Sequence, residues 1–166
     1  MTELAVRPFQ SDDLVAVVAA RPDLVRGARA RFQEWIGAQG WPEDASQDMV
    51  LAVNEAVTNV VEHAYPPGRP GMCHLHAWVS TAPRTGERRL VATVTDRGEW
   101  TERIAPDADR RFRGRGLELM RGLVAQMHVQ RSAGGTTIIL IGTAVQDAPL
   151  RDEDAEGVPS GVGVDP

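Results

Sequence analysis

The 166-residue chain contains no lysine, and all 18 of its basic residues are arginine. A phosphate-binding loop of the G-x-x-x-x-G-K-[ST] type requires its lysine, and so does a protein kinase of the eukaryotic type. Schiff-base catalysis by lysine requires the same side chain. The composition therefore excludes these three classes of protein.

Cysteine and long apolar runs are also scarce. The single cysteine, Cys73, excludes an internal disulfide. No stretch approaches the roughly 18 uninterrupted apolar residues of a membrane span, and "MTELAVRPFQSDD" lacks the charged start and apolar run of a signal peptide. We therefore expect a cytoplasmic protein with no membrane partner.

The net charge of −5 is concentrated at the C-terminus. The segment 146–166 holds six of the 23 acidic residues and one of the 18 arginines, which leaves 17 of each sign in the rest of the chain. A neutral body is a poor nucleic-acid binder. We expect an N-terminal extension at 1–12, one domain at 13–145 and an acidic, disordered tail at 146–166.

Hydrophobic periodicity predicts the order strand, helix, helix, strand, strand, loop, helix, strand, strand along the domain. Short connections between neighbouring strands imply antiparallel pairs. We expect an α+β two-layer sandwich, in which a mixed, mostly antiparallel sheet is covered by helices on one face. The predicted elements are a short buried strand at 14–20, helices at 21–39, 42–64 and 114–127, a long loop at 99–113, and further strands at 73–81, 90–95, 128–132 and 136–143.

The second predicted helix carries a polar stripe within "LAVNEAVTNVVEHAY", where Glu55, Asn59 and His63 recur every four residues. At 100° per residue they lie opposite the valines of the same helix. A solvated polar face would give this pattern. A binding site would also give it, because an asparagine oxygen suits Mg²⁺ and a carboxylate one turn away can deprotonate a hydroxyl.

Two glycine-containing motifs follow. In "VTDRGEW", Asp96 ends an apolar strand and Gly98 would let a flat ring approach the backbone, although a plain turn fits equally. In "RFRGRGLELM", Gly114 and Gly116 precede a helix whose free N–H groups could bind an anion, and arginines crowd the same place. A glycine-rich hinge is the alternative there. "GGTT", which ends at Thr137, could be a hairpin turn or could present hydroxyls to a base.

Taken together, the stretch from about Leu14 to Val145 resembles the bacterial anti-sigma-factor serine kinases of the gyrase/histidine-kinase-type (GHKL) ATPase superfamily. "NEAVTNVVEHAY" is similar to the family's N box, "DRG" to its first glycine box, "RGRGLELM" to its second and "GGTT" to its last. The resemblance implies the Bergerat-type ATPase fold, with ATP and Mg²⁺ bound between the N-box helix and a lid.

The resemblance also implies roles for individual residues. Asn59 matches the Mg²⁺ ligand and Glu55 the acid proposed as general base. Asp96 matches the partner of the adenine amino group, Gly98 lies against the adenine, and Thr137 matches the polar residue beside Asp96.

The second glycine box supplies the remaining expected nucleotide contacts. Gly114 and Gly116 match the glycines that contact phosphate, and Arg113, Arg115 and Leu117 accompany them. His63 occupies the family's helix-end position, where it could contact the nucleotide or simply close the helix C-terminus. Trp100 replaces the second glycine of the usual D-x-G-x-G sequence, which leaves the lid hinge in doubt.

The function that the resemblance implies is a serine/threonine protein kinase and anti-sigma regulator. Its partners would be a sigma factor and a STAS-type anti-anti-sigma protein, and a homodimer is common in the family. The alternative is a module that binds ATP or ADP as a switch and captures a partner without phosphotransfer. A histidine kinase is not expected, because only about 40 residues precede the N-box helix. Nucleic-acid binding conflicts with the neutral body.

Overall fold

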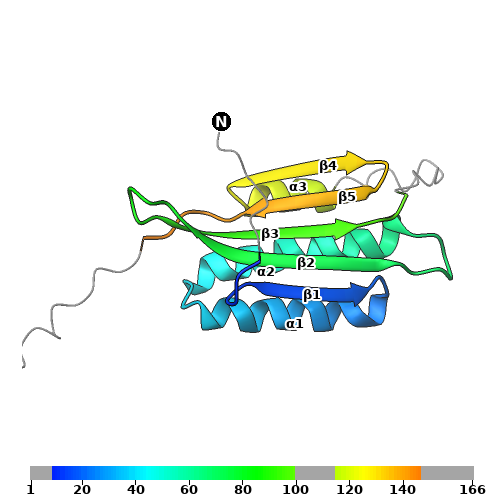
Figure 1. Ribbon diagram of the computed structural model, residues 1–166, viewed down its shortest axis with the longest axis horizontal. Coiled ribbons are helices and arrows are strands. Elements are labelled where there is room, and N and C mark those ends of the chain that lie inside the picture. The colour runs from blue at the N-terminus through cyan, green and yellow to red at the C-terminus, as the bar shows by residue number, and fades with distance from the viewer. Residues whose placement is uncertain (1–8, 100–114, 147–166) are drawn as a thin grey trace, which may run out of the picture.

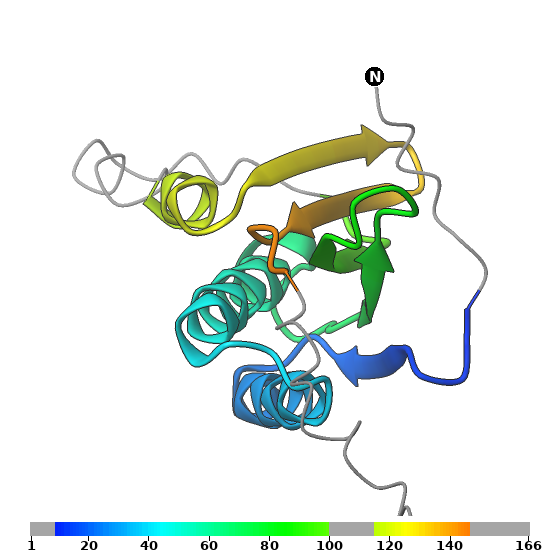
Figure 2. The same cartoon turned by 90° about the vertical axis from the view of Figure 1, so that its left-hand side faces the viewer.

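The computed structural model describes residues 9–99 and 115–146 of the chain. In this part, five strands form one sheet and three α-helices lie together on one of its faces (Figures 1 and 2). The strands are β1 (Leu14–Ala19), β2 (Met72–Thr81), β3 (Arg88–Asp96), β4 (Gln126–Ser132) and β5 (Gly135–Ile141). The helices are α1 (Pro22–Ala38), α2 (Glu43–Asn59) and α3 (Arg115–Leu123), and a π-helical turn, η1 (Val60–Ala64), continues α2.

The strand order in the sheet is β1-β2-β3-β5-β4, and every pair of neighbours is antiparallel. The predicted two-layer α+β sandwich is confirmed, and the sheet is antiparallel throughout rather than mixed. The reason is visible between β1 and β2, where the chain runs out along one helix and back along the other (Figure 1). A strand that follows two antiparallel helices returns in the direction opposite to the strand that precedes them.

The main core lies between the two layers. Side chains on the inner face of the sheet alternate with those on its outer face, as they do in any strand. Inner-face residues such as Leu75, Val94 and Leu140 pack against Phe32 of α1 and Val53 of α2, and all five are at most 1% exposed. None of the described helices combines the length and apolarity that crossing a bilayer requires.

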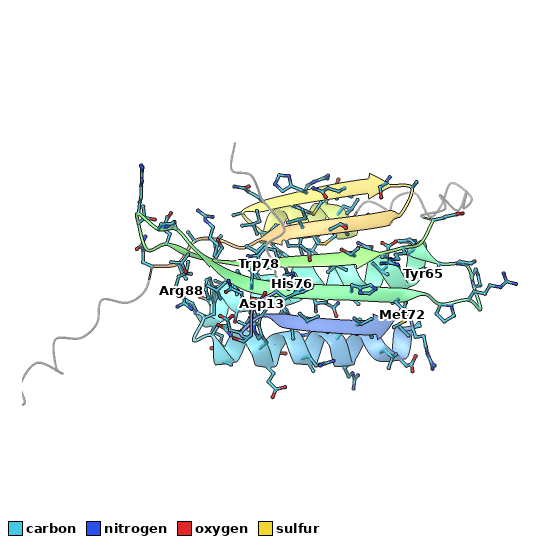
Figure 3. The ribbon with its side chains drawn as sticks, viewed as in Figure 1. Asp13, Tyr65, Met72, His76, Trp78 and Arg88 are labelled. Carbon is cyan, nitrogen blue, oxygen red and sulfur yellow. The ribbon has the colours of Figure 1, made fainter. Side chains whose placement is uncertain are left out.

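A smaller cluster of Trp78, Val91, Ile139 and Ile141 lies on the outer face of the sheet, and a part-buried hydrogen bond between His76 and Asp13 lies beside it. His76 Nε2 lies 2.8 Å from Asp13 Oδ2, and the His76 ring stacks on Trp78 with 4.6 Å between centroids (Figure 3). This pair ties the residue before β1 to the middle of β2.

Two predicted elements need correction. The helix predicted at 114–127 ends at Leu123, and β4 already begins at Gln126, because Met127 and Val129 alternate with exposed neighbours and pair with β5. The strand predicted at 14–20 is an edge strand rather than a buried one, since Val15 and Val17 are 47% and 48% exposed. The predicted loop at 99–113, the start of the N-terminal extension and nearly all of the acidic tail lie outside the described residues.

Candidate functional site

The polar stripe of α2 meets the start of α3 at a glycine. A β-carbon added to Gly116 would lie 3.4 Å from Asn59 Oδ1, 3.5 Å from Asn59 Nδ2 and 3.5 Å from Glu55 Oε2. Because glycine carries no side chain, the backbone of α3 approaches both polar groups closely at this point. The structure thus brings together the N box and the second glycine box, which lie far apart in the sequence.

The same region of α2 is largely buried. Ala52 and Ala56, which flank the polar stripe, are both 0% exposed. Glu55 and Asn59 are themselves half-buried, and α3 contacts α2. A solvated polar face, the alternative considered for this helix, does not fit these burials.

The side-chain amide of Asn59 lacks part of its hydrogen bonding. Its Nδ2 atom is buried and has no hydrogen-bond partner among the described residues. An unsatisfied buried polar group costs about 1–3 kcal/mol, so proteins normally provide a partner. The oxygen and nitrogen of an amide are assigned from their surroundings, so the reversed amide would present its oxygen instead. A ligand in the space beside Gly116 would satisfy the amide in either orientation.

These residues fit a divalent cation that arrives with a phosphate. Mg²⁺ takes one or two protein oxygens and completes its shell with water and phosphate oxygens. The amide oxygen of Asn59 is a ligand of this kind, and the carboxylate of Glu55 lies beside it. Within residues 9–99 and 115–146, no three His, Cys, Asp or Glu side chains are grouped to hold a metal. Phosphate and water would therefore have to supply the other ligands.

Asp96 lies at the other end of the site, at the last residue of β3. Its side chain is on the inner face of the sheet and is 1% exposed. The backbone N–H of Gly98 donates a hydrogen bond to Asp96 Oδ1 at 2.9 Å, which fixes the carboxylate against its own loop. A β-carbon at Gly98 would overlap the carbonyl oxygen of Ala64, the last residue of η1. Gly98 is therefore needed where the loop contacts the helix end, and its contact with an adenine ring stays a prediction.

The turn before β5 closes on the same loop. Gly135 has φ of 124°, which L-residues rarely adopt, and a β-carbon there would overlap the carbonyl oxygen of Asp96. Thr136 follows it with 4% exposure. It lies on the inner face, as do Ile138 and Leu140 further along the strand.

Thr137 is not beside Asp96, contrary to the prediction. It pairs with Thr95 on the outer face, where the two hydroxyl oxygens are 3.0 Å apart. Since neighbouring side chains in a strand point to opposite faces, Thr136 is the residue that shares the inner face with Asp96. The alternation of Thr136 with the buried residues Ile138 and Leu140 was the sequence signal that would have identified it.

His63 lies in η1, at the end of the N-box helix, as expected. A π-helical turn contains more residues than an α-helical one, so His63 does not continue the α-helical spacing of Glu55 and Asn59. Its side chain is 40% exposed, and Nε2 lies 3.7 Å from Glu62 Oε2. This place in the last turn agrees with the alternative, in which the imidazole closes the helix C-terminus.

The other expected residues of the second glycine box are placed only in part. Arg113 and Gly114 lie outside the described residues, and Arg115 begins α3. Leu117 is half-buried and packs against the main core, which gives it a structural role. Its contact with a nucleotide stays a prediction.

Cys73 was not identified as a site residue from the sequence, yet it is paired with Asp96. The two residues are opposite each other in β2 and β3, and Cys73 is 2% exposed. Burial, together with a smaller effect of the Asp96 carboxylate, raises the pKa of the Cys73 thiol to about 12. The Asp96 end of the site therefore contains a neutral thiol rather than a reactive thiolate.

The two-layer fold is that of an ATPase-type domain. Residues 18–141 match the family model described as a histidine kinase-like ATPase domain, and the chain belongs to this family. The family resemblance predicted from the motifs is thereby confirmed.

Named relatives are distant but cover most of the chain. Proteins named serine-protein kinase RsbW, from Halalkalibacterium halodurans and Bacillus subtilis, are 26% and 27% identical to it. These matches cover 78% and 76% of this chain and 82% of each relative. The crystal structure of the RsbU and RsbW domains of Rv1364c from Mycobacterium tuberculosis matches with a TM-score of 0.61 and 28% identity. That match covers 82% of this chain, which spans 33% of the longer chain.

Proposed function

We propose that this chain binds ATP with Mg²⁺ and acts as a serine/threonine protein kinase that regulates a sigma factor. Its substrate would be a STAS-type anti-anti-sigma protein. Membership of the ATPase family and the relatives named as serine-protein kinases support this proposal. The observation that carries it is the unsatisfied amide of Asn59, which lies with Glu55 next to Gly116 at the start of α3.

In this proposal, the nucleotide lies along the line from Gly116 to Asp96. The first N–H groups of α3 have no partner within the helix and bear the positive end of its dipole, so they favour phosphate. Asn59 holds the cation through its amide oxygen. The Asp96 carboxylate accepts a hydrogen bond from the adenine amino group, and the hydroxyl of Thr136 lies on the same face of the sheet.

The chemistry is phosphoryl transfer from ATP to a serine or threonine hydroxyl. Glu55 accepts the hydroxyl proton while the hydroxyl oxygen bonds to the γ-phosphorus, and the bond from that phosphorus to the bridging oxygen breaks to release ADP. Mg²⁺, when bound, supplies neutralisation of the phosphate charge. The remaining contribution of the protein is to hold the reacting groups in place.

The binding part of the proposal is tested by thermal stabilisation with ADP and Mg²⁺. At a ligand concentration of about 100 times Kd, a protein gains about 2.7 kcal/mol, or roughly 5–10 °C in Tm for a domain of this size. We expect this shift in the wild type and a much smaller one in Asn59→Ala. Asn54→Ala is the matched control, because Asn54 is a half-buried asparagine on the same helix. Equal shifts in the two variants would remove Asn59 from the site.

The kinase part is tested by incubating the chain with ATP, Mg²⁺ and candidate STAS-type proteins, followed by intact mass spectrometry. We expect the partner to gain one phosphate with the wild type. Glu55→Gln should abolish transfer while ADP still stabilises the protein, because it removes the base but retains the shape of the side chain. If the partner binds in a nucleotide-dependent way and is never phosphorylated by the wild type, the alternative switch module replaces the kinase.

The partners that we propose are therefore proteins: a sigma factor, a STAS-type antagonist and, as a further expectation, a second copy of the chain. We expect the protein to act in the cytoplasm, without direct contact with nucleic acid. Co-purification with a sigma factor, in the absence and in the presence of the phosphorylated antagonist, would test the partner assignment.

A further inference from the structure

Tyr65, the only tyrosine of the chain, links the end of the N-box helix to two other segments of the site. It follows η1 directly in an extended conformation. Its hydroxyl donates a hydrogen bond to the carbonyl oxygen of Met72 at 2.7 Å and accepts one from the backbone N–H of Arg97 at 3.0 Å. Figure 3 shows Tyr65 and Met72 together at one end of the sheet.

The position of this hydroxyl is fixed by the ring that carries it. A β-carbon added to Gly71 would overlap ring atoms of Tyr65, so the ring lies directly on the backbone before β2. The hydroxyl therefore cannot move away from Met72 without moving the ring off Gly71. It provides a fixed acceptor for the N–H of Arg97.

Arg97 is the residue between Asp96 and Gly98, so its N–H belongs to the loop that orients the Asp96 carboxylate. Gly98 binds that carboxylate through its own N–H and contacts the Ala64 carbonyl group at the helix end. The hydroxyl of Tyr65 thus holds this loop from the side of the N box.

We propose that Tyr65 is a positioning residue for base recognition: its hydroxyl fixes the loop that aims the Asp96 carboxylate at the exocyclic amine of the nucleotide. This inference rests on the proposed function, because it assumes that a nucleotide base binds at Asp96. It adds a selectivity role for a residue that touches neither the base nor the phosphates.

If the Tyr65 hydroxyl had a purely structural role, its loss would affect the stability of the fold more than the choice of base. The hydroxyl of Tyr65 makes its bonds at the surface, where water can replace it, so its loss costs the fold little. Recognition of an amine by a carboxylate is sensitive to direction, since hydrogen bonds weaken steeply when their angle departs from linearity. Loss of the hydroxyl should therefore affect the choice of base more than it affects the fold.

The experiment compares ADP with inosine diphosphate, which carries an oxygen in place of the exocyclic amine. Calorimetry with Mg²⁺ gives both dissociation constants for the full chain. We expect the wild type to prefer ADP by roughly tenfold or more, because a site built to bind an amine rejects the analogue that lacks it. In Tyr65→Phe, which keeps the ring on Gly71, ADP binding should weaken by about fivefold or more while inosine diphosphate binding changes less than about twofold.

Thr95→Val is the matched control. It also removes one hydroxyl, and Thr95 adjoins Asp96 in the chain, but this hydroxyl bonds to Thr137 on the outer face. The preference for ADP should remain at the wild-type value in this variant. Hydrogen exchange of the unliganded proteins gives a second measurement, in which the amide of Arg97 should exchange faster in Tyr65→Phe than in the wild type.

The possible failures can be told apart. If the wild type prefers ADP and Tyr65→Phe keeps the same preference, the positioning role is overturned and the proposed function stands. Unchanged exchange at Arg97 would also overturn it, whatever the affinities. If the wild type binds neither nucleotide, the proposed function and this inference are both overturned.

Discussion

Replacing Gly116 with alanine should change stability and nucleotide binding in opposite directions. Gly116 is the second residue of α3. Alanine is favoured over glycine by up to about 1 kcal/mol inside a helix, and by less near its start. The added methyl group would lie 3.4–3.5 Å from Asn59 and Glu55, which is ordinary van der Waals contact. We therefore expect the unliganded variant to be as stable as the wild type, or more stable by up to about 1 kcal/mol.

The same methyl group would occupy the space that the proposed phosphate needs. Placing an extra methyl group in a closely packed region typically costs about 1–3 kcal/mol. Because this cost would be paid only when the nucleotide is bound, ADP with Mg²⁺ should bind about 5-fold to 150-fold more weakly. Urea unfolding of the unliganded protein and calorimetry with ADP and Mg²⁺ give the two quantities separately.

Gly122→Ala provides a matched control in the same helix. A β-carbon at Gly122 would have none of the described residues within 4 Å, so this variant gains helix propensity without approaching the site. It should bind ADP as the wild type does. If Gly116→Ala binds ADP as tightly as Gly122→Ala does, the phosphates do not bind between α2 and α3. Our hypothesis for the position of the nucleotide would then be wrong.

Three further predictions test other parts of the site. Since the pKa of Cys73 is raised from 9.0 to about 12, its thiolate fraction at pH 8 is about a thousandfold lower than usual. Alkylation at pH 8, followed by mass, should therefore be slow in the native protein and complete in urea; rapid native alkylation would contradict the burial. Thr136→Val should weaken ADP binding about fivefold and Thr137→Val should leave it unchanged, and the reverse result would restore Thr137 to the site. Gly98→Ala should lower the free energy of unfolding by about 1–3 kcal/mol, because its methyl group would meet the Ala64 carbonyl oxygen; an unchanged urea midpoint would show that this contact yields easily.

Much of the fold could be predicted because burial imposes a period on the sequence. The valines of α2 and the alternating residues of β2 gave both elements in nearly their observed places. The boundary between α3 and β4 could not be found in this way, because Met127, four residues after Leu123, fits the end of an amphipathic helix as well as an edge strand. Only the pairing of β4 with β5, a contact between segments, decides between them.

The site was predictable to the extent that motifs mark it. Glu55, Asn59 and Asp96 were identified because each interrupts an apolar pattern. Thr137 was chosen over Thr136 because the motif fixes a position in the chain but not the face of the strand. Tyr65 was missed because its role depends on two backbone groups from other segments, Met72 and Arg97, and no pattern in the sequence indicates such contacts.

The glycines of the site serve two different physical purposes, which their motifs do not distinguish. Gly98 and Gly135 lie where a β-carbon would overlap another backbone, so the fold itself requires them. Gly116 lies where a β-carbon would fit without overlap, so nothing in residues 9–99 and 115–146 requires it. A residue that the fold does not need, and that costs helix stability, is best explained by something that binds there. Gly116 therefore indicates a bound ligand more strongly than Gly98 does, although both belong to glycine motifs that resemble those of the family.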